Sequence, residues 1–213
     1  MLVSARMPSE VWQTAKKMWE AGLVTGSAGN VSRRLDAERI AITPSGVAYD
    51  VLTEDQIVIV DAASGQAEAG VPSYELPMHL AIYRSHPELA AIVHTHAPYV
   101  TTLSILRTPL PAFIDEMIIH LGGAVPVANY AFTGTDAVGT NVVRTLGDRA
   151  GVLLANHGNV CVGRTLAHAL NAALVMESCA RTYVQALAIG TPAELPNDAI
   201  AAGRKLFESR YRS

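Results

Sequence analysis

The chain alternates short apolar runs typical of strands with longer segments of helical periodicity, and this alternation limits the folds open to it. Apolar residues recur at helical spacing over residues 11–21, 76–85, 99–106, 165–188 and 197–207. Short β-like runs cover residues 31–33, 40–43, 57–61 and 90–96, and a further one includes Leu153. No repeat period divides the sequence into smaller units. The pattern predicts the α/β class, with one mixed sheet flanked by helices in a single domain over residues 1–213.

Composition and charge exclude several classes of function. The 213 residues include 16 Lys plus Arg and 19 Asp plus Glu, which gives a formal net charge of −3. We expect no nucleic-acid partner, because no basic run is longer than Arg33-Arg34 and a phosphate backbone requires concentrated positive charge. We also expect a cytoplasmic protein without membrane contact, since the chain shows neither a signal-like nor a membrane-spanning apolar run. A composition of 50% hydrophobic and 16% charged residues favours burial of apolar surface between subunits.

Two further features carry no predicted chemistry. Cys161 and Cys179 stand in apolar segments, where reduced buried thiols are commoner than a disulfide or a redox pair. Gly22, Gly26 and Gly29 do not form a dinucleotide fingerprint, because a β-like run follows them where that motif requires a helix.

Three histidines and one glutamate stand at positions suited to a metal site. His94 and His96 end a strand-like run, and side chains two residues apart on a strand share a face. His157 follows another apolar run, at the edge of a sheet where α/β proteins place their sites. Glu75 stands near the start of a predicted helix. Three imidazoles and a carboxylate form a ligand set that suits zinc.

Each of these residues also has an ordinary structural interpretation. A His-x-His pair at a strand end is often only polar, and a carboxylate such as Glu75 is favoured by the positive end of a helix. His79, one turn beyond Glu75, is more typical of helix packing than of a fifth ligand. His86, His120 and His168 are predicted to be structural or solvent-facing. Spacing alone leaves both interpretations open.

Five motifs follow one another along the chain in a recognisable order. They are residues 25–32 (TGSAGNVS), 42–46 (ITPSG), 73–79 (SYELPMH), 94–96 (HTH) and 156–158 (NHG). Together they resemble the class II aldolase/adducin family, and within it most closely the branch of the L-fuculose-1-phosphate aldolases. The resemblance spans nearly the whole chain. It implies a three-layer α/β/α sandwich with a central mixed, mainly antiparallel sheet, a homotetramer, and a zinc site near the subunit boundaries.

The resemblance also implies roles for individual residues. It places the metal ion on His94, His96 and His157, and makes Glu75 a fourth ligand that swings away to act as acid and base. The phosphate group of the substrate is matched to Gly29, Asn30, Ser45, Gly46 and Ser73. Hydroxyl and amide groups can donate to an anion, and glycine lets backbone N–H groups approach it closely. Tyr211 matches a family tyrosine that reaches into a neighbouring subunit.

Two departures from the aldolase pattern concern the reaction. Tyr74 stands where the aldolases have a second serine of the phosphate site. The segment 111–116 has no tyrosine where the aldolases have a proton donor, and carries Asp115 and Glu116 instead. An acidic residue there is similar to the related L-ribulose-5-phosphate 4-epimerases, although those have Asp at the position of Glu75. Asp115 or Glu116, together with Tyr211, are therefore our candidates for a second acid and base.

The implied activity is zinc-dependent cleavage of a ketose 1-phosphate, similar to L-fuculose 1-phosphate, into dihydroxyacetone phosphate and an aldehyde through an enediolate. Mn²⁺ or Co²⁺ are alternative ions for the same site. The lysines, Lys16, Lys17 and Lys205, lie in helical segments that are expected to be exposed, which disfavours a Schiff-base mechanism. Sugar-phosphate 4-epimerisation, decarboxylation of a sugar-acid phosphate, and a non-catalytic adducin-like interaction domain stay open as alternatives.

Overall fold

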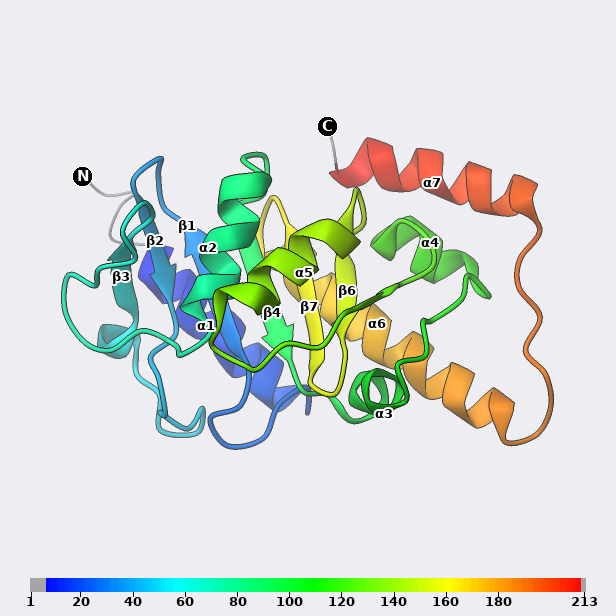
Figure 1. Ribbon diagram of the computed structural model, residues 1–213, viewed down its shortest axis with the longest axis horizontal. Coiled ribbons are helices and arrows are strands. Elements are labelled where there is room, and N and C mark those ends of the chain that lie inside the picture. The colour runs from blue at the N-terminus through cyan, green and yellow to red at the C-terminus, as the bar shows by residue number, and fades with distance from the viewer. Residues whose placement is uncertain (1–6, 212–213) are drawn as a thin grey trace.

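A computed structural model describes residues 7–211, and the remaining positions of the predicted 1–213 domain lie outside the described residues. Seven strands form one sheet in the order β3-β2-β1-β4-β7-β6-β5 (Figure 1). Their bounds are β1 Asn30–Arg34, β2 Arg39–Ile42, β3 Val58–Asp61, β4 Ala91–Thr95, β5 Val127–Ala128, β6 Gly151–Leu154 and β7 Gly158–Gly163. Neighbouring strands are antiparallel except β5 and β6, which are parallel. The sheet is therefore mixed and mainly antiparallel, as predicted.

Helices cover both faces of this sheet and give three layers. In Figure 1, α2 (Leu76–Ser85) and α5 (Asp136–Leu146) lie on the near face, and α1 (Met7–Glu20) and α6 (Leu166–Leu187) lie behind. The helices α3 (Pro98–Leu106) and α4 (Asp115–Leu121) pack against α6, and α7 (Asn197–Tyr211) packs against α4. A short 3₁₀ turn, η1, covers Glu54–Gln56. The predicted α/β/α sandwich is confirmed.

Alternation along the strands divides the apolar residues into two cores. On β4, Val93 belongs to the core under α1 and α6, whereas Ile92 belongs to the core under α2 and α5. The same alternation places Val31 in the first core and turns Asn30 and Ser32 toward α2. The polar residues Asn30 and Ser32 thus lie on the α2 face of the sheet.

Every predicted helix and strand is present, with ends shifted by a few residues. The largest shifts are in the first helix, which begins at Met7 and not at Val11, and in the last, which continues to Tyr211. Thr165 caps α6 as expected, because its side chain accepts a hydrogen bond from the backbone N–H of His168 at 3.1 Å. Cys161 and Cys179 are buried and unpaired.

Two helices and two strands were not predicted, namely α4, α5, β5 and β7. The sequence of α5, DAVGTNVVRTL, is rich in β-branched residues and contains Gly139, all of which weaken a helical prediction. In the fold Gly139 has a packing function, since a Cβ there would lie 2.6 Å from Ala81 Cβ on α2. Tertiary packing therefore overrides the local preference.

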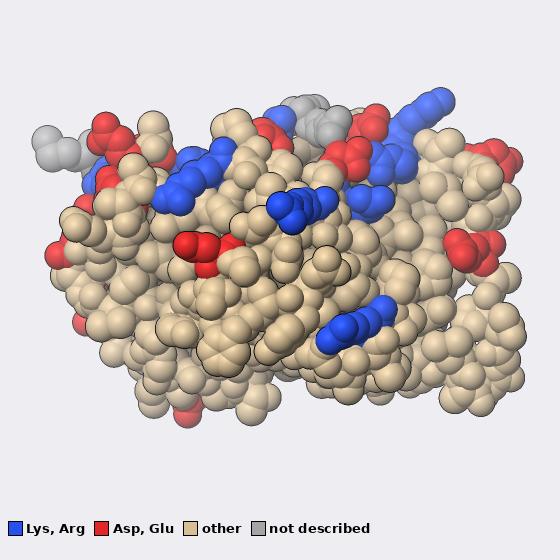
Figure 2. All heavy atoms as spheres, viewed as in Figure 1, with Lys and Arg blue, Asp and Glu red and all other residues tan. Residues whose placement is uncertain are grey.

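Charged side chains are sparse on part of the surface. In Figure 2 they lie mainly along the upper border of the visible face, and the lower half, where β4 ends in Figure 1, is formed mostly by uncharged residues. None of the described helices is both long and apolar enough to cross a membrane.

Candidate active site

Four side chains converge at the edge of the sheet where β4 ends and β1 and β7 begin. His94 is on β4, His96 follows that strand, His157 lies in the turn between β6 and β7, and Glu75 precedes the first residue of α2. Glu75 Oε2 lies 2.9 Å from His94 Nε2, and Glu75 Oε1 lies 3.2 Å from His157 Nε2. His96 Nε2 lies 2.9 Å from His94 Nε2. The structure thus brings together the four residues that the sequence analysis singled out.

The three imidazole rings form an almost regular triangle. Each pair of ring centroids among His94, His96 and His157 is 4.8 Å apart, with interplanar angles of 68° to 74°. One ligand atom from each histidine and one from Glu75 lie within 4.8 Å of one another. Lone pairs brought this close repel each other unless a proton or a cation lies between them, so the donor set fits a divalent metal ion such as zinc.

A hydrogen bond on the side of the ring away from the cluster fixes the tautomer of His94. Its Nδ1–H donates to the backbone oxygen of Asn159 at 2.8 Å, so Nε2 faces the cluster and offers a lone pair to a metal ion whenever it is not protonated. The side chain of Asn159 is itself held, because its Oδ1 accepts from Thr95 Oγ1 at 2.5 Å. A backbone carbonyl is the usual second partner of a metal-binding histidine.

The charges of the metal-free cluster leave two neutral imidazoles. Burial lowers the pKa of His96 to about 3 and that of His157 to about 4, and the positive charge of His94 adds to the effect. Burial also opposes the charged forms of His94 and Glu75, but their mutual attraction outweighs it, raising the pKa of His94 and lowering that of Glu75. One proton shared with Glu75 thus occupies the region that a cation would take.

Close backbone contacts hold the segments that carry these ligands. A Cβ at Gly158 would lie 2.3 Å from the backbone oxygen of Thr95, so only glycine lets the turn approach β4. The sharp turn itself is made by Asn156, which has a φ of 57°, and not by Gly158. A Cβ at Gly29, whose φ is 76°, would lie 2.6 Å from the backbone oxygen of His94.

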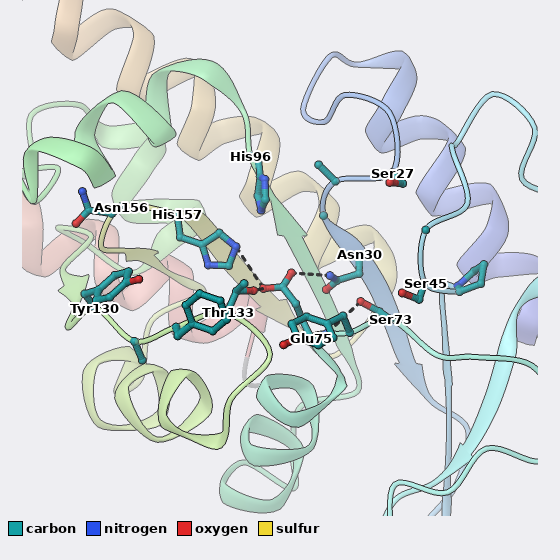
Figure 3. A pocket seen from close by; sticks show the side chains of 17 residues that line it. Ser27, Asn30, Ser45, Ser73, Glu75, His96, Tyr130, Thr133, Asn156 and His157 are labelled. Carbon is teal, nitrogen blue, oxygen red and sulfur yellow. Dashed lines mark hydrogen bonds and ion pairs between the residues drawn. The ribbon is translucent and has the colours of Figure 1, made fainter.

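A cavity of about 380 Å³ opens beside this cluster, and every residue matched to phosphate binding lines it. These residues are Gly29, Asn30, Ser45, Gly46 and Ser73, and they line the cavity together with Glu75, His96 and His157. Figure 3 shows Ser27, Ser45 and Ser73 on the side opposite His157, with Glu75 between them. Among the described residues, no Lys or Arg lines this cavity. An anion bound there would rely on hydroxyl groups, backbone N–H groups and the metal ion.

The carboxamide of Asn30 faces the carboxylate and not the open cavity. Its Nδ2 donates to Glu75 Oε2 at 2.9 Å, and its Oδ1 lies 2.5 Å from His79 Nε2. Asn30 is only 2% exposed. Its oxygen and one of its two Nδ2 hydrogens are therefore engaged within the protein.

The predicted second acid and base residues are not brought to this cavity within one chain. Asp115 and Glu116 lie exposed in the first turn of α4. Tyr211 ends α7 and packs against Phe207 and His168. None of the three lines the cavity beside the metal ligands.

The loop of residues 129–135 contributes to the site although no sequence signal pointed to it. Thr133 Oγ1 donates to Glu75 Oε1 at 2.9 Å, which is drawn in Figure 3. Tyr130 and Phe132 line the cavity from the same loop and are more than half exposed. Tyr74, which is 60% exposed, also lines it and packs on Gly134, where a Cβ would lie 2.0 Å from its ring. Aromatic side chains thus form one wall.

Comparison with known proteins agrees with the fold. The family model described as Class II Aldolase and Adducin N-terminal domain matches residues 9–184. The chain is 38% identical over 194 residues to an L-fuculose phosphate aldolase of Escherichia coli O6:H1, covering 91% of this chain and 89% of that protein. It is 36% identical over 202 residues to a 5-deoxy-D-ribulose 1-phosphate aldolase of Bacillus thuringiensis, covering 93% and 94%.

A solved structure of L-fuculose 1-phosphate aldolase superposes on the chain with a TM-score of 0.89, at 36% sequence identity and with 95% and 96% of the two chains covered. The chain therefore belongs to the class II aldolase and adducin family, as an enzyme similar to the L-fuculose-phosphate aldolases.

Proposed function

We propose that the chain is a zinc-dependent aldolase that cleaves a ketose 1-phosphate, similar to L-fuculose 1-phosphate, into dihydroxyacetone phosphate and an aldehyde. The observation that carries this proposal is the position of Glu75 between His94 and His157 at one end of a cavity whose other side consists of serine and glycine loops. Two similar proteins are named as aldolases of ketose 1-phosphates, which supports a substrate of this class.

The metal ion in this proposal is held by His94, His96 and His157, with Glu75 as the fourth ligand. When bound, it supplies a Lewis acid that polarises the carbonyl group of the substrate. The three imidazoles fit zinc. Mn²⁺ or Co²⁺ would bind to the same donor atoms, for which they have a weaker preference. Once released from the ion and protonated, the carboxyl group of Glu75 would donate its proton to the carbon at which the bond has broken, and it would regain a proton from solvent before the next turnover.

The phosphate group would lie on the far side of the cavity, against Gly29, Asn30, Ser45, Gly46 and Ser73. Gly46 suits this function, because its φ is 71° and a Cβ there would meet no atom within 4 Å, so the backbone is open to an approaching anion. Because one of the two Nδ2 hydrogens of Asn30 donates to Glu75 and its Oδ1 faces His79, only the second N–H of this amide could donate to the phosphate group.

The proton of the aldehyde-side hydroxyl group requires a second acid and base. We assign it to Asp115 or Glu116 together with Tyr211, supplied by a neighbouring copy in a homotetramer. The exposed apolar side chains Ile105, Leu106, Ile114, Leu174, Leu187 and Ile189 support an assembly of this kind.

Epimerisation or decarboxylation on the same metal site is the second candidate. The observation that favours it is Asp115, which stands in the segment where the aldolases have a tyrosine. Both reactions would use the same metal ligands, so only the products separate them.

The experiment is release of dihydroxyacetone phosphate from a panel that includes L-fuculose 1-phosphate and 5-deoxyribulose 1-phosphate. Zinc-loaded protein is compared with protein treated with a chelator and with chelated protein to which zinc is returned. We expect release that disappears with the metal and reappears on its return. Absence of release from zinc-loaded protein would overturn the aldolase proposal, and the panel would then be examined for 4-epimers and for carbon dioxide from sugar-acid phosphates.

A further inference from the structure

A chain of buried hydrogen bonds leads away from Glu75 on the side opposite the cavity. Asn30 Nδ2 donates to Glu75 Oε2, and Asn30 Oδ1 lies 2.5 Å from His79 Nε2. His79 Nδ1 lies 2.6 Å from Ser32 Oγ, which in turn lies 2.9 Å from the Tyr83 hydroxyl. All five side chains are buried, and His79 and Ser32 are 0% exposed. Polar groups buried this deeply must be satisfied by one another.

The positions of these residues follow from the geometry of two elements. Glu75, His79 and Tyr83 are spaced four residues apart, so they follow one face of α2 from its start. Asn30 and Ser32 are two residues apart on β1, so both side chains point from the same face of the strand toward α2. The chain of hydrogen bonds therefore runs along the contact between α2 and β1.

The direction of every bond in this chain is determined by its first member. An ionised carboxylate only accepts, so Asn30 presents its NH₂ group to Glu75 and its oxygen to His79. His79 then carries its proton on Nε2 and accepts on Nδ1, which requires Ser32 to donate to Nδ1 and to accept from Tyr83. Burial lowers the pKa of His79 to about 3, so the neutral imidazole that this pattern requires is the form present at neutral pH.

We propose that His79 is a positioning residue for the proposed reaction, because its Nε2–H holds the Asn30 carboxamide with the NH₂ group toward Glu75. This inference rests on the function proposed above in one respect, namely that Glu75 changes its protonation or position during turnover. Whenever Glu75 is protonated or displaced, the carboxylate no longer selects the orientation of the Asn30 amide. His79 keeps that orientation, so that a donor and not an oxygen meets the carboxylate when it returns.

Two amide substitutions of His79 separate this function from simple packing. In His79→Gln, the longer side chain can place an N–H near the position of Nε2, facing Asn30. In His79→Asn, the shorter side chain can only reach the position of Nδ1, facing Ser32. We expect His79→Asn to lower kcat about 10–100-fold with KM changed by less than about threefold, and His79→Gln to stay within about threefold of the parent enzyme.

Tyr83→Phe is the matched control, because it removes a hydroxyl at the far end of the chain and leaves the Asn30 contacts in place. We expect its kcat to stay within about threefold of the parent value. Thermal unfolding of all variants identifies any that fail to fold. Equal losses in the Gln and Asn variants, or a greater loss in Gln, would overturn the proposal.

A second measurement does not depend on activity. In metal-free protein labelled with ¹⁵N-histidine at pH 7.5, the His79 ring should give the signals of a neutral imidazole protonated on Nε2, assigned by their loss in His79→Gln. A ring protonated on Nδ1 or on both nitrogens would overturn the proposal even in a folded, active enzyme. If no substrate is turned over but the Nε2–H form is found, the aldolase function fails and the orientation of Asn30 by His79 stands.

Discussion

At the scale of single residues, each carboxylate oxygen of Glu75 contacts one histidine and accepts a hydrogen bond from one neutral side chain. Oε2 contacts His94 and accepts from Asn30, and Oε1 contacts His157 and accepts from Thr133. The positive charge of His94 keeps the pKa of Glu75 low despite its burial, and the two neutral donors fix its orientation. A carboxylate held in this way is prepared to give up a proton rather than to store one.

Glu75→Gln tests this function directly. The carboxamide has the same shape but cannot transfer a proton, so we expect turnover to fall about 10²–10⁴-fold. The three histidines remain, so bound zinc, measured by elemental analysis of dialysed protein, should stay near one ion per chain. Thr133→Val, which removes only one donor to the carboxylate, is the control and should lower turnover about tenfold. A Glu75→Gln variant with more than a tenth of the parent turnover would remove Glu75 from this function.

His79 makes a second residue-scale prediction, for metal-free protein. Its pKa is about 3 in the folded chain and 6.5 is its ordinary value, so below pH 6.5 the unfolded chain binds a proton that the folded chain does not. Stability therefore falls as pH falls through this window. Because of His79, we expect the free energy of unfolding to fall by about 2 kcal/mol between pH 6.5 and pH 5.

Urea unfolding at several pH values, compared between the parent and His79→Gln, isolates this contribution. The comparison is needed because the depressed pKa values of His96 and His157 act in the same direction. Identical pH dependence in the two proteins would show that His79 is already charged in the folded state.

At the scale of elements, glycines decide how closely the ligand-bearing segments meet. Gly29, just before β1, and Gly158, at the start of β7, both lie against the backbone at the end of β4. Backbone atoms cannot move away as a flexible side chain can. The distance between His94 and the other candidate ligands therefore depends on the absence of a Cβ atom at Gly29 and at Gly158.

Gly29→Ala and Gly26→Ala separate this contact from backbone strain. Both glycines have positive φ, 76° and 61°, but a Cβ at Gly26 meets no atom within 4 Å. We expect Gly26→Ala to cost about 1 kcal/mol of unfolding free energy. Gly29→Ala should cost about 2–4 kcal/mol and also weaken zinc binding, because the end of β4 must shift. Isothermal titration with zinc and urea unfolding measure the two effects, and equal results for both variants would contradict this account.

Most elements were predictable from the sequence because they depend on short-range patterns, and the family resemblance grouped the four candidate metal ligands, which the structure brings together. Apolar periodicity located β4, and the spacing of His94 and His96 on one strand face followed directly from it. The contribution of Thr133 was not predictable, because it depends on where an irregular loop returns to the sheet. The helix α5 was missed for a related reason, since Gly139 is required by contact with α2 and weakens the local helical signal. The residues matched to phosphate binding line one cavity, but the hydrogen bond from the Asn30 amide to Glu75 could be seen only in three dimensions.

At the scale of the whole molecule, the three residues predicted as a second acid and base do not line the candidate site of their own chain. Asp115, Glu116 and Tyr211 all lie away from the cavity, on α4 and at the end of α7. A homotetramer would bring such residues from a neighbour and cover the exposed apolar side chains. Light scattering should then give a mass of about 90 kDa, four times the 22.6 kDa of one chain.

Complementation between inactive chains tests the shared site. Glu75→Gln and Tyr211→Phe chains, each of low activity alone, are co-expressed with different tags and the mixed oligomers isolated. If Tyr211 acts in a neighbour's cavity, some mixed sites carry both parent residues, and activity should exceed that of either variant. Activity equal to the average of the two variants would show that Tyr211 does not act in a neighbour's cavity, and Asp115→Asn and Glu116→Gln would then be tested in the same way.

The regular triangle of imidazoles has a consequence for reconstitution. Two of its corners lie on or directly after one strand, the third lies in a turn that glycine packs against that strand, and a seven-stranded sheet supports all three. The protein core thus positions the three imidazoles. The conformational entropy that must be lost to bring these ligands together is therefore lost on folding and not on metal binding. Emptying the site should leave a folded protein that accepts different ions in turn, and the chain rather than the ion would then dictate the coordination geometry.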